Sequence, residues 1–258
     1  MQKRFLLMML VLVLSACGTQ TGTLEIQANG EDFARQPFVS KDGWTISFEH
    51  IWLTLAEVTA YQTETPFDAS LGIAPEGTAV SLTTPHTIDL TTGTEAILLE
   101  SAEAAVGQFN AVSWDMISGN DGNTLQLVGT AEKDSTSIPF DISITQTYSY
   151  FCGEYVGDER KGFVEAEQTG DVELTFHFDH IFGDADTPLD DSLNTSALGF
   201  DPLATLATDD GLIAIQSDLE EGLGGDAYAL LLDNLATLGH VGEGHCFEAE
   251  NGYTAKDE

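Results

Sequence analysis

Short runs of alternating apolar and polar residues, separated by turn residues, recur along most of this chain. Such alternation is typical of strands with one buried face, and clusters of Gly, Asn and Asp between the runs are typical of tight turns. The pattern predicts a mostly β protein folded as an antiparallel β-sandwich. The clearest runs are residues 44–61, 108–118, 125–131, 138–147 and 171–184.

Two of these runs carry more specific expectations. The sequence Gly119-Asn120-Asp121-Gly122 is a strong hairpin signal, so residues 125–131 are expected to pair back onto residues 108–118. The run 44–61 is apolar on both parities, which predicts a central strand or a strand between layers. Within it, His50 falls in an aromatic row, where a hydrogen-bonded core histidine is the alternative to a ligand.

The alternating pattern stops after residue 184. Asp201-Pro202 predicts the start of a short helix, and residues 226–238 repeat leucine at helical spacing before a glycine, which predicts a longer helix. We therefore expect residues 23–183 to form the β-sandwich. Residues 184–258 are expected to form a loop and helix extension that packs on the same domain.

The start of the chain has the character of a targeting segment. Two basic residues precede the apolar run 5–14, which is too short to span a bilayer, and Leu14-Ser15-Ala16-Cys17 follows. This segment resembles the bacterial lipoprotein signal, whose lipobox ends in the cysteine that becomes lipidated. The resemblance implies a signal peptide at residues 1–16, a lipid on Cys17, a tether at residues 17–22, and a lipid-anchored location facing the periplasm or the exterior. An uncleaved anchor or a plain secretory signal is the alternative.

The chain is strongly acidic, with 43 Asp and Glu against eight Lys and Arg and a formal net charge of −35. Such a surface repels nucleic acid and anionic lipid headgroups, which excludes polyanionic partners. Because basic residues are rare throughout, the charge fits a general surface bias that favours solubility. Neither a Gly-rich phosphate loop nor a nucleophile elbow occurs, so the sequence gives no basis for a nucleotide enzyme or a serine hydrolase.

Four of the six histidines fall in two short clusters that also hold carboxylates. Imidazole and carboxylate groups are the usual ligands of zinc and related ions. We predict that the four histidines meet around one ion, with a carboxylate as a further ligand or as an orienting group, and with His50 as an outside candidate. Incidental histidines on a strand face and in a loop are the alternative. The candidates are His177, Asp179 and His180 in the first cluster, and His240, Glu243 and His245 in the second.

This single-site prediction requires a bend in the backbone between the two histidines of the first cluster. On an ideal strand, His177 and His180 point to opposite faces, so the chain must bend at residues 179–181 if both bind one ion. Since the ligands would be neutral imidazoles, metal affinity should fall as the pH drops through roughly 6.5.

Cys152 and Cys246 are the two cysteines that remain beyond Cys17. An exported protein meets an oxidising compartment, so a Cys152–Cys246 disulfide is the natural pairing. Thiolate ligands or two free thiols are the alternative. The disulfide would hold the segment of His245 against the Tyr-rich segment around Cys152.

The ligand chemistry favours zinc and leaves copper and iron open, because imidazole suits all three and Cu(I) prefers sulfur. In Phe48-Glu49-His50, and in His240-Val241-Gly242 followed by Cys246, the chain resembles the periplasmic copper-binding partner proteins of methanobactin systems. That resemblance implies a copper site on a β-rich protein of the periplasm.

We therefore expect a cell-envelope lipoprotein that binds a transition metal for storage, delivery or sensing, in contact with another envelope or transport protein. A metallo-hydrolase would use the same atoms, but no His-Glu-x-x-His motif occurs, so the sequence does not indicate an enzyme. The alternative is a metal-free interaction module that binds a glycan or another envelope protein, for which Trp44 or Trp52 would be exposed.

Overall fold

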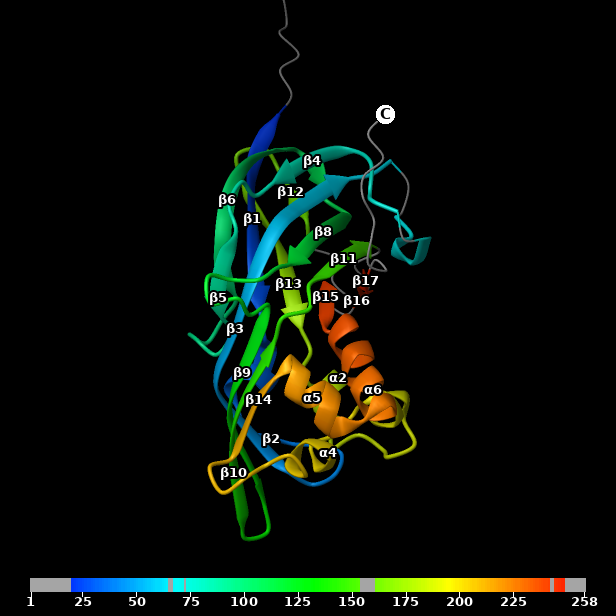
Figure 1. Cartoon of the computed structure of the whole chain (residues 1–258). Helices are drawn as coiled ribbons and strands as arrows, with labels where there is room; N and C mark the ends of the chain where they lie inside the picture. Colours follow the sequence, from blue (N-terminus) through cyan, green and yellow to red (C-terminus); the bar gives the residue numbers. More distant parts are fainter. Residues whose placement is uncertain (1–19, 65–66, 72, 154–160, 242–243, 249–258) are drawn as a thin grey trace, which may run out of the picture.

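A computed structural model of the protein describes residues 20–64, 67–71, 73–153, 161–241 and 244–248. The fold is mostly β, with 46% strand and 19% helix, which is the predicted class (Figure 1). The proposed signal peptide and Cys17 lie outside the described residues. No helix in the described part of the chain has both the length and the apolar character needed to cross a bilayer.

Two large sheets share one continuous core. Apolar side chains from both sheets, such as Ile26, Ile51 and Phe176, belong to it, and the arrangement is sandwich-like. Pairing is mostly antiparallel, but β1 runs parallel to β13 and β10 runs parallel to β14, so the sheets are mixed rather than purely antiparallel. The first sheet has the order β16 (Gly244–His245), β15 (Gly239–Val241), β13 (Thr169–Phe176), β1 (Thr21–Asn29), β6 (Ile97–Ala105).

The second sheet is built around the 18-residue strand β3 (Thr45–Gln62). Its other strands are β14 (Leu212–Ile215), β10 (Thr136–Ile144), β9 (Leu125–Lys133), β8 (Ala111–Met116), β11 (Tyr148–Gly153), β17 (Phe247–Glu248), and the short β2 (Phe38–Val39), β4 (Thr78–Ser81) and β5 (His86–Asp89). A separate two-stranded sheet pairs β7 (Gly107–Gln108) with β12 (Phe163–Val164).

Strand β3 changes its buried face along its length. Its first part buries even-numbered side chains such as Ile46, and the next part buries odd-numbered ones such as Ile51. The change coincides with a register irregularity between Phe48 and His50, and a second irregularity lies near Glu57. Because an extra residue in one strand exchanges its two faces, these bulges explain why β3 is apolar on both parities. β3 is thus central in its sheet, which is one of the two predicted alternatives, but it is not covered on both faces around His50, whose side chain is 46% exposed.

The connection between β8 and β9 is not the expected hairpin. β8 ends beside Leu55 of β3 and β9 begins beside Leu53, so the two strands follow one another along β3 instead of pairing together. The turn itself is present, since the Gly122 N–H donates to the Gly119 carbonyl at 3.0 Å. Residues 117–124 thus leave the sheet as a compact loop and return to the same strand. Turn residues mark where the chain folds back, but they do not fix which strand its arms pair with.

The segment after residue 184 provides strands as well as helices. β14 joins β10, β15 and β16 extend the first sheet, and β17 pairs with β11, so this segment is more than the expected loop and helix extension. It also contributes to the shared core, through residues such as Phe200 and Leu231. Strands of two to four residues are too short to show a periodic pattern, which is why the sequence did not reveal them.

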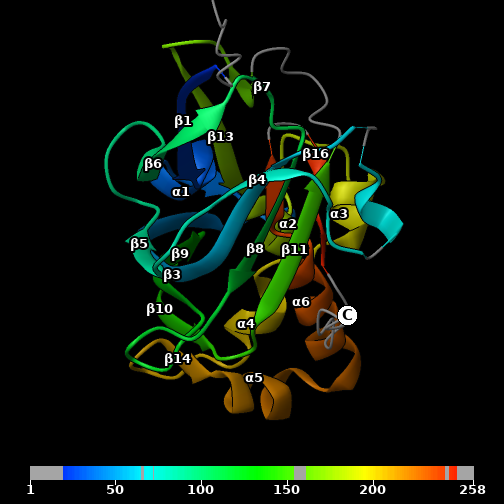
Figure 2. The ribbon, with the colours of Figure 1, turned by 90° about the horizontal axis from the view of Figure 1, so that it is seen from above.

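The predicted helices are present as α4 and α6. They gather with α5 on one side of the sheets in both views (Figures 1 and 2). The helices are α1 (Glu31–Arg35), η1 (Ala69–Leu71), α2 (Asp179–Phe182), α3 (Ser192–Ser196), α4 (Asp201–Ala204), α5 (Gln216–Leu223) and α6 (Gly225–Ala236).

Candidate metal centre

Strand β13 ends at Phe176, directly before the first cluster of candidate ligands. The His177 N–H donates to the Leu238 carbonyl at 3.1 Å, and the chain then enters the single-turn helix α2 at Asp179. Gly183, with a φ of 68°, follows that turn. The strand expected to continue through His177 and Asp179 therefore stops early, and the chain bends in the region where binding by both histidines required a bend.

The second cluster reaches the first through strand pairing. β15 lies antiparallel to β13, with His240 opposite Thr175, two residues before His177. His240 is only 2% exposed. Strand pairing therefore brings an imidazole from the C-terminal segment beside the end of β13.

Together, His177, His180 and His240 form a compact cluster, here called the histidine cluster. One ligand nitrogen from each lies within 4.8 Å of the others. The rings of His177 and His240 stack with centroids 4.0 Å apart and an interplanar angle of 8°, and His180 meets His240 at 4.9 Å and 75°. Nitrogens bound tetrahedrally to zinc at 2.0–2.1 Å lie about 3.4 Å apart. Because imidazole lone pairs lie in the ring plane, the stacked rings of His177 and His240 would have to tilt apart before both could bind one ion.

Glu31, at the start of α1, adds a carboxylate that the sequence analysis missed. Its Oε2 lies 3.5 Å from Nε2 of His177. The backbone at Glu31 has a φ of 55°, and its N–H donates to the Asn29 side chain at 2.9 Å. Nothing in the sequence links Glu31 to a histidine so distant along the chain, because the two meet only through the parallel pairing of β1 with β13.

Asp179 lies in the first cluster, as a buried residue that is 9% exposed. Burial raises the pKa of its carboxyl group, and the nearby His177 acts in the opposite direction. Its Oδ1 is buried and has no hydrogen-bond partner in another of the described residues, although its own backbone N–H helps to lower the pKa of the carboxyl group. Leaving a buried carboxylate oxygen without a donor is costly, and a cation held by the adjacent imidazoles would reduce that cost. These residues therefore fit a metal ion.

A pocket of about 390 Å³ borders the histidine cluster on the side of His180. Nδ1 of His180 lies 3.0 Å from Oγ1 of Thr237, a contact that orients the imidazole ring. Of the three histidines, His180 is the one that lines this pocket, together with side chains from α3 and from the end of α6. Its lining residues are His180, Ser192, Leu193, Ser196, Asn234 and Thr237.

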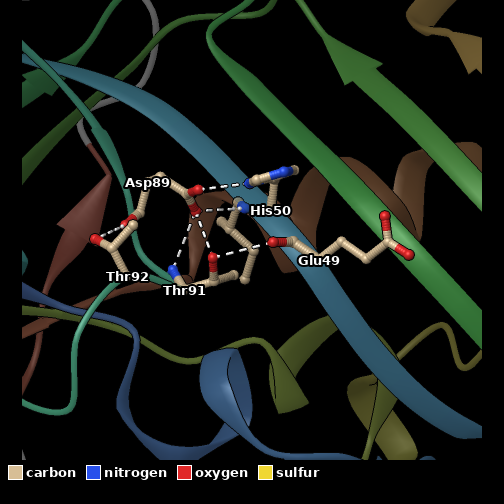
Figure 3. Close-up of polar contacts among 6 residues, drawn as sticks. Glu49, His50, Asp89, Thr91 and Thr92 are labelled. Atoms are coloured by element: carbon tan, nitrogen blue, oxygen red, sulfur yellow. Dashed lines mark hydrogen bonds and ion pairs between the residues drawn. The ribbon is translucent and has the colours of Figure 1, made fainter.

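The remaining candidates are placed differently. The backbone of His245 pairs with that of His240, which brings it beside the cluster, but the His245 side chain and Glu243 lie outside the described residues. His50 does not belong to the group of three. Its Nδ1 lies 2.7 Å from Oδ2 of Asp89 (Figure 3). Its ring also stacks on Trp52, so it is a hydrogen-bonded histidine on the partly exposed face of β3.

A disulfide joins Cys152 of β11 to Cys246, the residue after His245. The two Cα atoms lie 4.3 Å apart, although 94 positions separate the cysteines in sequence. The Cys246 N–H also donates to the Gly239 carbonyl at 3.1 Å. The disulfide therefore links the β15–β16 hairpin of the first sheet to β11 of the second sheet, close to His240.

Fold and site together define a mostly β, sandwich-like protein with three histidines gathered between a strand end and a C-terminal hairpin. No family model, no curated protein and no solved structure matches the chain.

Proposed function

We propose that this protein is a cell-envelope lipoprotein that binds a transition metal through His177, His180 and His240. The observation that carries the proposal is the convergence of three imidazoles from two segments that are distant in sequence. The chain has only six histidines, so half of them gather at one point. Two neighbouring carboxylates, Glu31 and Asp179, add negative charge that would favour a bound cation.

Zinc is the ion that this donor set fits best. Three imidazoles with one open position are an established zinc arrangement, and the carboxylates would orient or complete the set. Cu(I) prefers sulfur, and the nearby sulfur atoms of Cys152 and Cys246 are joined to each other. Cu(II) and iron also accept imidazole, so the metal that is bound depends on supply as well as on the site.

Storage, delivery or sensing is the role that suits such a site. The pocket beside His180 would let an ion enter and leave without unfolding the sheet. A second envelope or transport protein is then the natural donor or acceptor of the ion. The histidine cluster has no associated motif of a known zinc hydrolase, so we propose metal binding rather than catalysis.

The proposed location rests on the N-terminal segment. The lipobox-like Leu14-Ser15-Ala16-Cys17 supports lipid attachment at Cys17, and the Cys152–Cys246 disulfide suits an oxidising compartment. Cys17→Ser is expected to release the protein from the membrane fraction or to leave its signal peptide uncleaved. A variant that fractionates and migrates like the parent would contradict the lipoprotein assignment.

Elemental analysis of untagged protein, purified after exposure to zinc, copper and iron salts, tests the metal proposal. We expect about one equivalent of metal per chain, and a loss of that metal in a His177→Ala/His240→Ala double variant. His86→Ala is the matched control, because His86 lies on β5, 3.8 Å from Glu100, and is not part of the histidine cluster. A parent protein that retains no metal, or a double variant that retains as much as the parent, would refute the proposal.

A further inference from the structure

A second pocket, of about 380 Å³, is lined by Trp52 on the partly exposed face of β3. Its floor is formed where β3 pairs with β5 and β9, which places Gln126 opposite Trp52 and Thr87 opposite Thr54. The two threonine hydroxyls are hydrogen-bonded to each other at 2.8 Å. The floor is therefore an aromatic ring bordered by hydroxyl and amide groups.

One wall of this pocket is the loop 117–124, which leaves the sheet between β8 and β9. It contributes Asn120, Asp121 and Asn123 to the lining. The Asn123 backbone N–H donates to Oδ1 of Asp121 at 3.1 Å, and its side-chain amide donates to Oδ2 at 3.2 Å. The loop also lies against the floor, since a Cβ added at Gly119 would be only 2.8 Å from Oγ1 of Thr54. The wall is thus held in place by contacts within the chain.

The Trp52 indole is held in place by contacts with His50. The His50 ring stacks on the indole, with centroids 4.1 Å apart and an interplanar angle of 16°. His50 is itself fixed through Asp89, whose Oδ1 accepts hydrogen bonds from the backbone N–H groups of Ile51 and Thr91 (Figure 3). This network holds a partly exposed indole in one orientation at the pocket, as a binding platform requires.

We propose that this pocket binds a neutral saccharide. The C–H face of a pyranose ring would pack on the Trp52 indole, and the surrounding amides and hydroxyls would exchange hydrogen bonds with the sugar hydroxyls. The net charge of −35 disfavours anionic ligands. Asp121 is the one ionisable side chain among the described lining residues, and both of its oxygens already accept hydrogen bonds from Asn123, so the pocket lacks a carboxylate cage for a cation. This site is separate from the histidine cluster and does not depend on metal binding.

The experiment is a titration of the protein with cellohexaose, chitohexaose and mannohexaose, followed by intrinsic tryptophan fluorescence. Trp44 and Trp114 are only 6% and 1% exposed, so the emission change should come from Trp52. This burial also corrects the expectation that Trp44 could be exposed. We expect a saturable change with at least one hexaose. No saturable change with any of the three, or a response to choline chloride in place of the sugars, would overturn the proposal.

Variants assign the binding to this pocket by calorimetry, which does not depend on the indole signal. Trp52→Ala should weaken binding of the active hexaose at least tenfold, and Asn123→Ala should weaken it severalfold even if the tryptophan variant folds poorly. Phe247→Ala is the matched control, because Phe247 is an exposed aromatic residue on β17 and does not line the pocket. Binding that is unchanged in Asn123→Ala and in a folded Trp52→Ala variant, or lost equally in Phe247→Ala, would refute the assignment.

Discussion

His50 and His240 occupy contrasting surroundings within one molecule. The side chain of His50 is 46% exposed, its Nδ1 contacts the Asp89 carboxylate, and a face of its ring stacks on the Trp52 indole. His240 is 2% exposed and lies between two other imidazoles. A carboxylate partner fixes a single imidazole in place, whereas imidazoles that converge from different segments create a set of donors for an ion. The neighbours of a histidine, rather than its presence, therefore indicate its role.

The two regions also differ in how they are held. The His50 region depends on hydrogen bonds around Asp89. Burial alone would raise the pKa of this carboxyl group, but hydrogen bonds from His50, Ile51 and Thr91 outweigh burial and lower it. The histidine cluster instead depends on strand pairing and on the disulfide that anchors the β15–β16 hairpin. Changes to one region should therefore leave the other intact.

The largest effect is expected from removal of the disulfide. A Cys152→Ser/Cys246→Ser variant should lose about 4–5 kcal/mol of unfolding free energy, the chain-entropy value for a loop of this length. It should also bind metal more weakly, because the hairpin of His240 loses its anchor. Urea denaturation and zinc titration measure the two effects. Unfolding free energy and zinc affinity that match those of the parent would show that the disulfide does not hold the cluster.

The second largest effect is expected on zinc affinity, and it distinguishes the histidines of the cluster from His50. His177→Ala and His240→Ala should each lower zinc affinity by about 100-fold or more, since even changes to groups behind metal ligands cost 10–100-fold. His50→Ala should leave zinc affinity unchanged. Competition with a zinc-sensitive dye gives the affinities. A loss in His50→Ala equal to that in His240→Ala would mean that the two regions had been wrongly separated.

Asp89→Asn tests the hydrogen-bond network that holds His50. We expect a loss of about 2 kcal/mol in unfolding free energy at pH 7, because several hydrogen bonds to a charged group are weakened. The pKa of Asp89 is lowered in the folded state, so its stabilising effect is present above the unfolded value of about 3.9 and is lost as the pH falls through the folded value. Urea denaturation should therefore show a smaller difference between parent and variant at pH 3 than at pH 7. A difference that is the same at both pH values would exclude this ionised network.

Glu31→Gln should have the smallest effect, about a tenfold loss of zinc affinity, because this carboxylate stands beside His177 and is not one of the three imidazoles. Glu103→Gln is a suitable control, since Glu103 is an exposed acidic residue on β6 that pairs with Thr23, at the end of β1 away from Glu31. Zinc titration at constant ionic strength compares the two variants. Equal losses in both would point to a general effect of surface charge.

Local patterns in the sequence predicted much of this fold. Alternation located most strands, leucine spacing located α6, and the remaining cysteines identified the disulfide pair. Patterns failed where tertiary pairing decides the outcome. The turn at Gly119–Gly122 exists, yet its arms follow β3 instead of each other, and bulges in β3 exchange the faces that a strict period of two would assign.

The histidine cluster shows the same limit. Two short His-containing segments suggested a shared site, and the structure brings together His177, His180 and His240. Glu31 could not be found this way, because only the pairing of β1 with β13 connects it to His177. Three candidates with a local signature therefore meet in the cluster and His50 does not, whereas Glu31, which long-range pairing places there, had no local signature.

X-ray absorption at the zinc edge of the zinc-loaded protein tests whether the three histidines bind one ion. A site built from His177, His180 and His240 predicts at least three imidazole ligands, with nitrogen at about 2.0–2.1 Å from the metal. The spectrum should lose this imidazole signature in the His177→Ala/His240→Ala variant and keep it in His50→Ala. A parent spectrum with fewer than three imidazoles, or one that the double variant leaves unchanged, would contradict a site built from these three histidines.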